Sequence, residues 1–258
     1  MFPVPEQFLA PNTYAYEAKP LVKRTGFREY DARWLFGSEI NPMGVQALGM
    51  GLGTLLGELG VKREIVVGHD YRSYSASIKQ ALTVGLMAAG CTVHDIGLAI
   101  TPMAYFAQFN LDVPAVAMVT ASHNENGWTG VKMGARRPIT FGPDEIGRLK
   151  DIVLASAFDM KGGGSYVFVE NFAERYIADL TARPKLTRKI KAVVACGNGT
   201  AGAFAPTVLE RLGVEVIPMD TALDYTFPRY NPNPEDMEML HAIAHRVKEH
   251  GADIGLGF

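Results

Sequence analysis

The chain has 258 residues, a formal net charge of −2, 48% hydrophobic residues and 20% charged residues. This length fits one large or two ordinary domains, and the composition is typical of a globular protein. The near-neutral charge argues against a nucleic-acid partner, and neither a secretory signal nor an apolar stretch long enough to span a membrane is visible. Cys91 and Cys196 fit no disulfide framework or metal spacing, so we expect a cytoplasmic protein.

The first half of the chain predicts alternating strands and helices after an irregular start. Residues 1–20 lack periodicity and predict an irregular arm, which a polar segment at 28–33 follows. Asn41 as a cap and Pro42 at the first position begin a helix whose regularly spaced glycines indicate close packing against a sheet. Strands are predicted at residues 64–67, 92–96, 115–119 and 128–133, and helices at 75–89, 101–110 and 143–157.

The second half repeats this alternation after a glycine-rich linker at residues 161–165. Helices are predicted at residues 169–180, 201–212 and 237–250, and strands at 190–195, 214–218 and 252–258. The alternation predicts an α/β protein in which largely parallel sheets carry helices on their faces, with a second domain after the linker. Because the chain stops within an apolar strand, we expect the second domain to be incomplete.

Polar side chains with catalytic potential are concentrated between residues 120 and 132, directly after the predicted strand at 115–119. Ser122, His123 and Asn124 follow that strand, and Lys132 stands ten residues after Ser122. Ligands of open α/β sheets bind at the carboxyl ends of strands. On residue chemistry alone, Ser122 is either an active group or the closure of a turn. Lys132 is either a solvated charge or, beside a phosphate or metal, a base with a depressed pKa.

Two early segments leave similar alternatives open. Asp70 and Arg72 are expected to form an ion pair that fixes a loop. Tyr30 and Arg33 either bind an anion or form a surface pair, and arginine is well suited to phosphate.

Residues Gly197–Gly202 match Gly-x-Gly-x-x-Gly between a predicted strand and a predicted helix, and Asp220 ends the next strand. This is the context of a dinucleotide-binding fingerprint. It favours, as an alternative function, an NAD(P)-binding oxidoreductase domain. The other interpretation is a glycine turn that lets strand and helix pack closely.

The segment Thr120-Ala-Ser-His-Asn124, with Gly130 and Lys132, resembles the phosphoserine loop of the α-D-phosphohexomutases, in particular the bacterial phosphomannomutase/phosphoglucomutase group. Three further segments resemble motifs of that family in the same order. They are Phe27–Arg33, Gly68–Ser73 and Thr101-Pro102.

The resemblance implies two consecutive α/β/α sandwich domains, residues 1–160 and 165–258, around mixed, largely parallel sheets. It also implies an enzyme that interconverts hexose 1-phosphate and 6-phosphate, of glucose or mannose, through a phosphoserine and a bound 1,6-bisphosphate. Ser122 would carry the phosphoryl group and bind Mg²⁺ through it, and Lys132 would be the general acid or base. His123 would also belong to the catalytic residues. Together with Asn124 it would order the loop and contact the phosphate. Tyr30 and Arg33 would line the same cleft.

The chain departs from the family pattern at three positions, where Glu125 replaces a proline, Thr129 an asparagine and Trp34 a glycine. These replacements suggest a divergent subgroup. In the family, a strand resembling 252–258 leads into an Asp-Gly-Asp-x-Asp-Arg loop with three magnesium-binding aspartates, which this chain does not contain. We therefore expect the 258-residue chain alone to lack mutase activity. A non-catalytic binding module is a further alternative, and the family explains Gly197–Gly202 as a structural turn.

Overall fold

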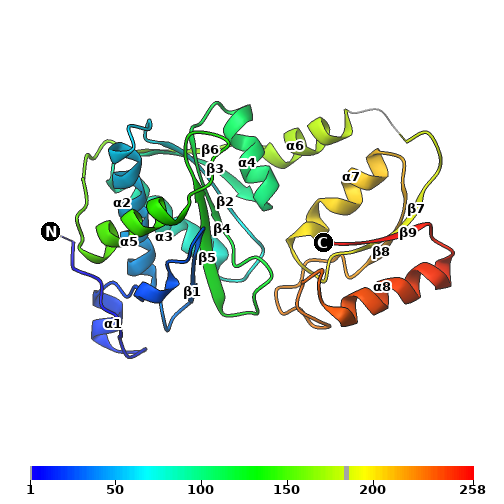
Figure 1. The fold of residues 1–258 in the computed structure, drawn as a ribbon, viewed down its shortest axis with the longest axis horizontal. Helices are drawn as coiled ribbons and strands as arrows, with labels where there is room; N and C mark the ends of the chain where they lie inside the picture. The colour runs from blue at the N-terminus through cyan, green and yellow to red at the C-terminus, as the bar shows by residue number, and fades with distance from the viewer. Residues whose placement is uncertain (1, 183–185) are drawn as a thin grey trace. The chain divides into compact units, whose positions relative to one another are not determined.

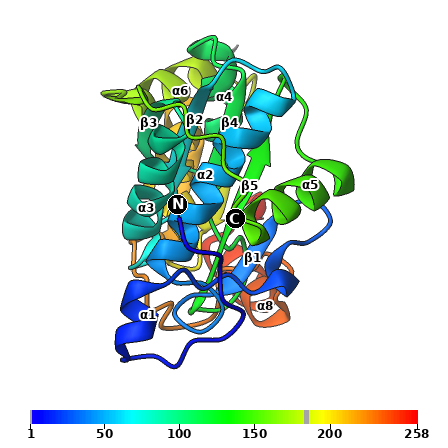
Figure 2. The ribbon, with the colours of Figure 1, turned by 90° about the vertical axis from the view of Figure 1, so that its left-hand side faces the viewer.

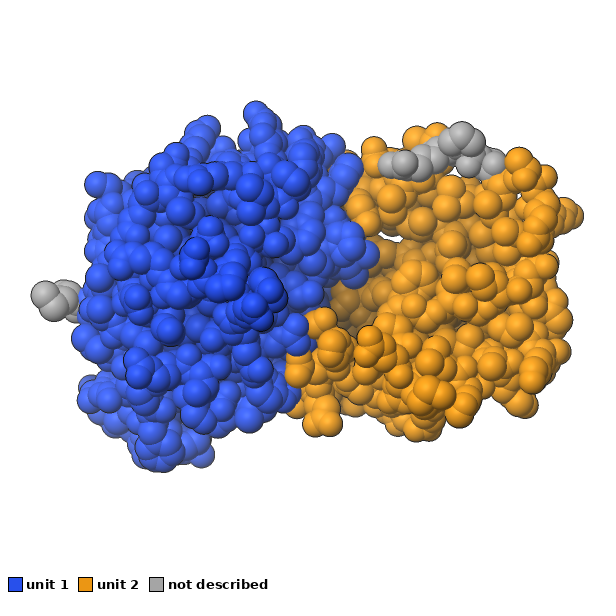
Figure 3. All heavy atoms as spheres, in the orientation of Figure 1, with its two compact units in different colours: residues 1–70, 74–121, 127–170 blue, residues 71–73, 122–126, 171–258 orange. Residues whose placement is uncertain are grey.

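A computed structural model describes residues 2–182 and 186–258. The chain forms two compact units (Figure 3). The first comprises Met1–Asp70, Tyr74–Ala121 and Gly127–Glu170, and the second comprises Tyr71–Ser73, Ser122–Asn126 and Asn171–Phe258. Each unit has its own sheet and its own buried core.

The first unit is built on a six-stranded mixed sheet with the strand order β1-β5-β4-β2-β3-β6. β2, β3, β4 and β6 run parallel, while β5 is antiparallel to both β4 and β1. The strands are β1 (Ala32–Leu35), β2 (Glu64–His69), β3 (Thr92–Leu98), β4 (Ala115–Val119), β5 (Trp128–Gly134) and β6 (Ser165–Phe168).

Helices cover both faces of this sheet. Figures 1 and 2 show α2 (Pro42–Glu58), α3 (Ser75–Ala88) and α5 (Pro143–Leu154) on one face and α4 (Thr101–Asn110) on the other. The short helices α1 (Tyr14–Ala18) and η1 (Arg24–Gly26) precede β1. The predicted α/β/α architecture with a mixed sheet is therefore confirmed.

The sequence indicated that the glycines of α2 allow close packing against a sheet. In the structure they allow a close approach of α2 to another helix, α3. A Cβ atom on Gly49 would lie 2.3 Å from the Leu82 carbonyl oxygen of α3, and one on Gly85 of α3 would lie 2.0 Å from the Gln46 carbonyl oxygen of α2. The expected cap is present, since the Asn41 side chain accepts a hydrogen bond from the Gly44 amide at 2.8 Å.

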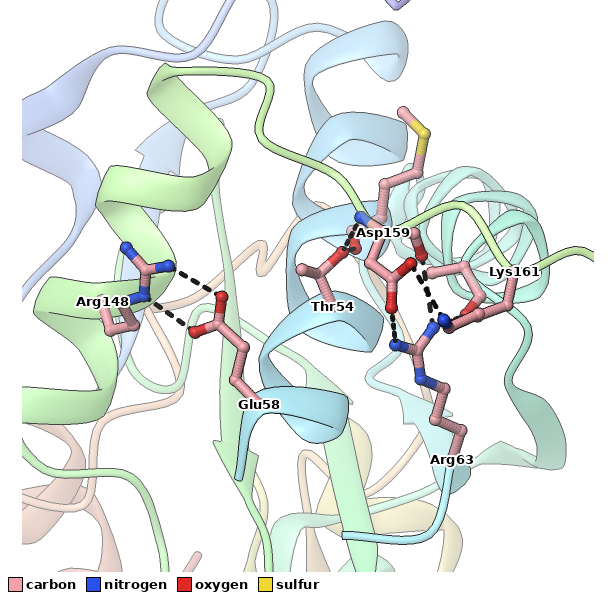
Figure 4. Close-up of polar contacts among 8 residues, drawn as sticks. Thr54, Glu58, Arg63, Arg148, Asp159 and Lys161 are labelled. Atoms are coloured by element: carbon pink, nitrogen blue, oxygen red, sulfur yellow. Dashed lines mark hydrogen bonds and ion pairs between the residues drawn. The ribbon is translucent and has the colours of Figure 1, made fainter. Parts of the chain in front are cut away.

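Polar contacts tie the C-terminal part of the first unit to α2 (Figure 4). Arg148 of α5 makes two hydrogen bonds to Glu58, at 2.8 and 2.7 Å. Asp159 accepts a hydrogen bond from Arg63 at 2.6 Å, and its amide donates to the Thr54 hydroxyl at 2.9 Å. The Asp159 amide thus holds this irregular segment at Thr54 of α2, and Arg148 holds α5 at Glu58.

The second unit contains a three-stranded parallel sheet with the order β8-β7-β9. One face packs against α8 through Met239 and Ile243, and the other packs against α7 through Ala205 and Leu209. The elements are α6 (Phe172–Thr181), β7 (Lys191–Ala195), η2 (Thr200–Ala203), α7 (Ala205–Arg211), β8 (Glu215–Met219), α8 (Met237–His250) and β9 (Ile254–Gly257).

Several predicted elements differ from the structure. The arm at residues 1–20 contains α1, the predicted helix at 201–212 is divided into η2 and α7, and β1 and β6 were not predicted. β6 begins at Ser165, the last residue of the predicted linker, and pairs with β3 at the sheet edge. Within the described ranges, no helix has both the length and the apolar character needed to cross a membrane.

Candidate functional site

The segment with Ser122 connects two neighbouring antiparallel strands, β4 and β5. Met118 pairs with Lys132 across these strands, and the Thr120 amide donates to the Gly130 carbonyl at 3.0 Å. On the return side, the Gly127 amide donates to the Tyr74 hydroxyl at 2.9 Å. The loop is therefore a hairpin connection whose two ends are fixed in the first unit.

Asp70 anchors the start of this connection from the end of the adjacent strand β2. Its carboxylate accepts hydrogen bonds from the hydroxyls of Thr120, at 2.7 Å, and Ser75, and its amide donates to the Val119 carbonyl at 3.0 Å. Asp70 and Thr120 are both buried. Buried polar groups that satisfy one another rigidify a site, so the base of the loop is well ordered.

Ser122 has a left-handed backbone conformation, with a φ of +57°. This region costs a residue other than glycine about 1–2 kcal/mol, and such strain persists only where the surroundings impose it. Here Arg72, which is buried, donates to the carbonyl oxygens of Ser122 at 3.2 Å, Glu125 at 2.9 Å and Asn124. One guanidinium thus fixes the path of the loop through three backbone carbonyls.

Residues between 225 and 231 of the second unit contact the same loop. Asn231 donates to the His123 carbonyl, and Asn126 donates to the Tyr225 carbonyl at 2.8 Å. The Phe227 ring lies 5.6 Å from the Arg72 guanidinium, in cation–π geometry. His123 is exposed and Asn124 is half-buried.

The structure brings Tyr30, Arg33 and Lys132 together around one cavity of about 420 Å³ in the first unit. The Arg33 guanidinium donates through Nε to Asp31 at 2.9 Å and through Nη1 to the Ala121 carbonyl at 3.4 Å. Arg33 thereby links β1 to the residue immediately before Ser122. The cavity is lined by Arg28, Glu29, Tyr30, Asp31, Arg33, Tyr105, Lys132 and Thr140.

The environment of Lys132 shifts its protonation equilibrium toward the neutral amine. Burial is the main cause that lowers the pKa of its ammonium group, and the positive charge of Arg33 lowers this pKa further. The negative charge of Asp31 acts in the opposite direction. In the folded chain the pKa of Lys132 therefore lies below the ordinary lysine value.

The six predicted site residues fall into two groups. Tyr30, Arg33 and Lys132 share the cavity of the first unit, whereas Ser122, His123 and Asn124 belong to the segment assigned to the second unit. Sequence reasoning did not identify Asp31 and Tyr105 as lining residues. It expected Arg72 to fix its own loop together with Asp70, and it missed the contact of Arg72 with the Ser122 loop. Asp31 stands between Tyr30 and Arg33 in the motif, which was an available signal, whereas Tyr105 had none.

The described residues include no acidic cluster that would hold a magnesium ion by itself. Mg²⁺ requires near-octahedral oxygen coordination. Within residues 2–182 and 186–258, no group of three or more His, Cys, Asp or Glu side chains is placed to hold a metal ion. Ser122 remains the one magnesium ligand expected from the sequence.

The glycines of Gly197–Gly202 serve the packing of the second unit. A Cβ atom on Gly197 or Gly199 would lie 2.9 or 3.0 Å from Pro232, and one on Gly202 would lie 2.1 Å from the Thr221 carbonyl oxygen. The space that a pyrophosphate would need in a dinucleotide fingerprint is thus filled by the chain itself.

Asp220, the acidic residue of that fingerprint, also has partners within the unit. Its carboxylate accepts hydrogen bonds from the Tyr230 hydroxyl at 2.6 Å and from Arg229 at 3.1 Å. The structure gives the NAD(P) alternative no support and favours the structural turn.

Comparison with known proteins gives a consistent result for both units. Residues 24–160 match the family description "Phosphoglucomutase/phosphomannomutase, alpha/beta/alpha domain I", and residues 168–258 match the corresponding domain II. A phosphomannomutase/phosphoglucomutase of Pseudomonas putida is 34% identical over 232 residues, which cover 90% of this chain and 49% of that protein. A phosphomannomutase of Vibrio cholerae is 34% identical and covers 91% of this chain and 52% of its own length.

The solved structures agree. A phosphoglucomutase/phosphomannomutase family protein from Burkholderia thailandensis superposes with a TM-score of 0.86 at 31% identity and covers 92% of this chain and 53% of that one. The chain spans about half the length of the curated relatives it matches.

Proposed function

The chain belongs to the phosphoglucomutase/phosphomannomutase family, and on that premise we propose that it takes part in interconverting hexose 1-phosphates and hexose 6-phosphates. In this proposal Ser122 carries the phosphoryl group. The observation that supports it most is the left-handed backbone of Ser122, fixed through Arg72 in a loop whose ends are also held. Phosphoryl transfer depends mainly on positioning and electrostatic stabilisation, so an imposed geometry suits this role.

The chemical step transfers the phosphoryl group from the serine to the sugar. A sugar hydroxyl oxygen attacks the phosphorus, the Ser122 Oγ–P bond breaks, and a new O–P bond gives a hexose 1,6-bisphosphate. The sugar hydroxyl loses its proton and Ser122 Oγ gains one, so the charge balances. The bisphosphate then reorients in the cleft, and its other phosphoryl group returns to Ser122 by the reverse step.

Lys132 is the proposed proton acceptor for the sugar hydroxyl. Only a neutral amine can take the proton, and burial together with Arg33 lowers the pKa of Lys132 toward that form. Tyr30 and Arg33 line the same cavity, and the planar guanidinium of Arg33 suits a phosphate oxygen pair. His123 and Asn124 are proposed to contact the phosphoryl group on Ser122.

The family resemblance also implies Mg²⁺, which would neutralise charge on the transferring phosphoryl group when bound. A phosphoryl oxygen on Ser122 is the ligand that we propose from this chain.

Phosphopeptide mapping of the protein purified from its own cells tests the role of Ser122. We expect phosphate on the peptide with Ser122, its loss in Ser122→Ala, and its retention in Ser156→Ala. Ser156 is a matched control because it is also a serine with a left-handed backbone, with a φ of +50°, in the first unit. Absence of phosphate from Ser122, or its presence on another residue in Ser122→Ala, would contradict the proposal.

A further inference from the structure

The cavity of the first unit contains one acidic side chain that is largely shielded and paired with a cation. The Asp31 and Arg33 side chains are 16% and 20% exposed, and 2.9 Å separates Asp31 Oδ2 from Arg33 Nε. The other acid of the cavity, Glu29, is exposed and interacts with the Tyr30 hydroxyl. The titratable groups around the cavity are Arg28, Glu29, Tyr30, Asp31, Arg33, Tyr105 and Lys132.

Strand pairing explains why Asp31 acts on both cations. β1 and β5 are antiparallel, with Ala32 opposite Val131. The same register brings the flanking residues, Asp31 and Lys132, to neighbouring positions at the end of β1. Asp31 therefore lies beside Lys132 while its carboxylate is bonded to Arg33.

Without the Asp31 carboxylate, the positive charges of Arg33 and Lys132 would share a partly buried wall whose other acid, Glu29, is exposed. The Arg33 guanidinium is held by Asp31 through Nε and by the Ala121 carbonyl through Nη1. Two like charges in a shielded site each destabilise the charged form of the other. A lysine ammonium loses its proton more readily than a guanidinium does.

We propose that Asp31 is a positioning residue, which holds Arg33 in the cavity wall through Nε and balances the charge of Arg33 at Lys132. This inference rests on the proposed role of Lys132 as proton acceptor. The negative charge of Asp31 offsets the positive charge of Arg33. Lys132 therefore stays basic enough to hold the proton that it accepts. The Asp31 carboxylate also holds the Arg33 guanidinium in a fixed position in which it can bind a phosphate.

Titration of Lys132 in the whole chain tests this inference without requiring turnover. Lysines are reductively methylated with ¹³C, the Lys132 resonance is assigned by its loss in Lys132→Arg, and its pKa is followed by NMR. We expect Asp31→Asn to shift the pKa of Lys132 downward and Asp31→Glu to leave it close to that of the unaltered chain. Glu29→Gln, which neutralises the exposed acid of the same cavity, should leave it unchanged.

The direction of the shift separates a charge effect from a loosened cavity. Burial is the main cause that lowers the pKa of Lys132. A structural opening of the cavity would therefore raise that pKa toward the ordinary lysine value. An unchanged or raised pKa in Asp31→Asn would overturn the inference.

The two proposals can fail separately. Phosphate on Ser122 with no effect of Asp31→Asn would leave the proposed function standing and remove the role of Asp31. The expected shift at Lys132 without phosphate on Ser122 would show that the charge balance exists and that the phosphoryl chemistry was wrongly assigned.

Discussion

Individual side chains show how burial sets charge in this chain, and His94 is the plainest case outside the site. Its Nε2 atom is buried and, within the described ranges, has no hydrogen-bond partner. Burial is the main cause that lowers the pKa of the ring, Lys62 adds to this effect, and Glu64 opposes it. A charged imidazole is therefore disfavoured at this position of β3.

This predicts a pH dependence of stability. The folded-state pKa of His94 lies below its unfolded value of about 6.5, so the unfolded state binds more protons between the two values. The free energy of unfolding should fall as the pH drops below about 6.5 toward the folded-state pKa. Urea denaturation between pH 5 and pH 8 measures it, and His94→Gln should give a flatter profile.

His241→Gln is the matched control, because His241 is an exposed histidine of α8. Its profile should follow that of the unaltered chain. Parallel profiles for His94→Gln and the unaltered chain would show that His94 does not contribute to the pH dependence.

The residues of the candidate site differ in how far the sequence could reveal them. Ser122 and Lys132 were identified from a compact motif, although their catalytic roles remain proposals. The bonds from Asp70 to Thr120 and from Arg72 to the loop join segments about fifty positions apart. Such contacts depend on β2 and β4 being neighbours in the sheet, which local sequence patterns do not specify.

At the level of elements, the contact between α2 and α3 depends on glycine. Gly85→Ala should destabilise the chain by about 1–3 kcal/mol, because the new methyl group would overlap the Gln46 carbonyl of α2. Gly147→Ala in α5 is the matched control, since no atom lies within 4 Å of its added Cβ. It should stabilise the chain by about 0.5–1 kcal/mol through helix propensity. Chemical denaturation of both variants measures these changes, and an equal effect of the two would contradict the packing argument.

Elements with a strong local signal were predicted well. The helix at Thr101–Asn110, the strand at Ala115–Val119 and the helix at Met237–His250 have the expected bounds. β1 and β6 are four residues long and depend on partners far along the chain, Gly130 for Arg33 and Asp95 for Phe168. A strand of that length carries too few alternating residues for its period to stand out.

At the scale of the whole molecule, the two units differ in the size of their cores. The core of the first unit draws on α2, α3, α5 and the six-stranded sheet, whereas the second unit has two small clusters on either side of β7. In the second unit, β9 has no buried residue and β8 has one, Met219. Few buried apolar contacts correspond to low local stability.

Hydrogen exchange should therefore distinguish the units. Amides of β7, β8 and β9 should exchange faster than those of β2 and β4, and denaturation should show the second unit unfolding first. Mass spectrometry of exchanged peptides provides the measurement. Equal protection of the two sheets, with a single unfolding transition, would show that the chain behaves as one cooperative unit.

The hairpin connection between β4 and β5 has a consequence for protein engineering. Because Thr120 and Gly127 are each tied to the first unit by their own hydrogen bonds, residues 122–126 can be exchanged as a cassette between two fixed ends. Libraries that vary the length or chemistry of this cassette should leave strand registration intact, since both strands keep their pairing partners outside it. Arg72 would select among the inserts, favouring those whose backbone offers carbonyl groups where the native loop does.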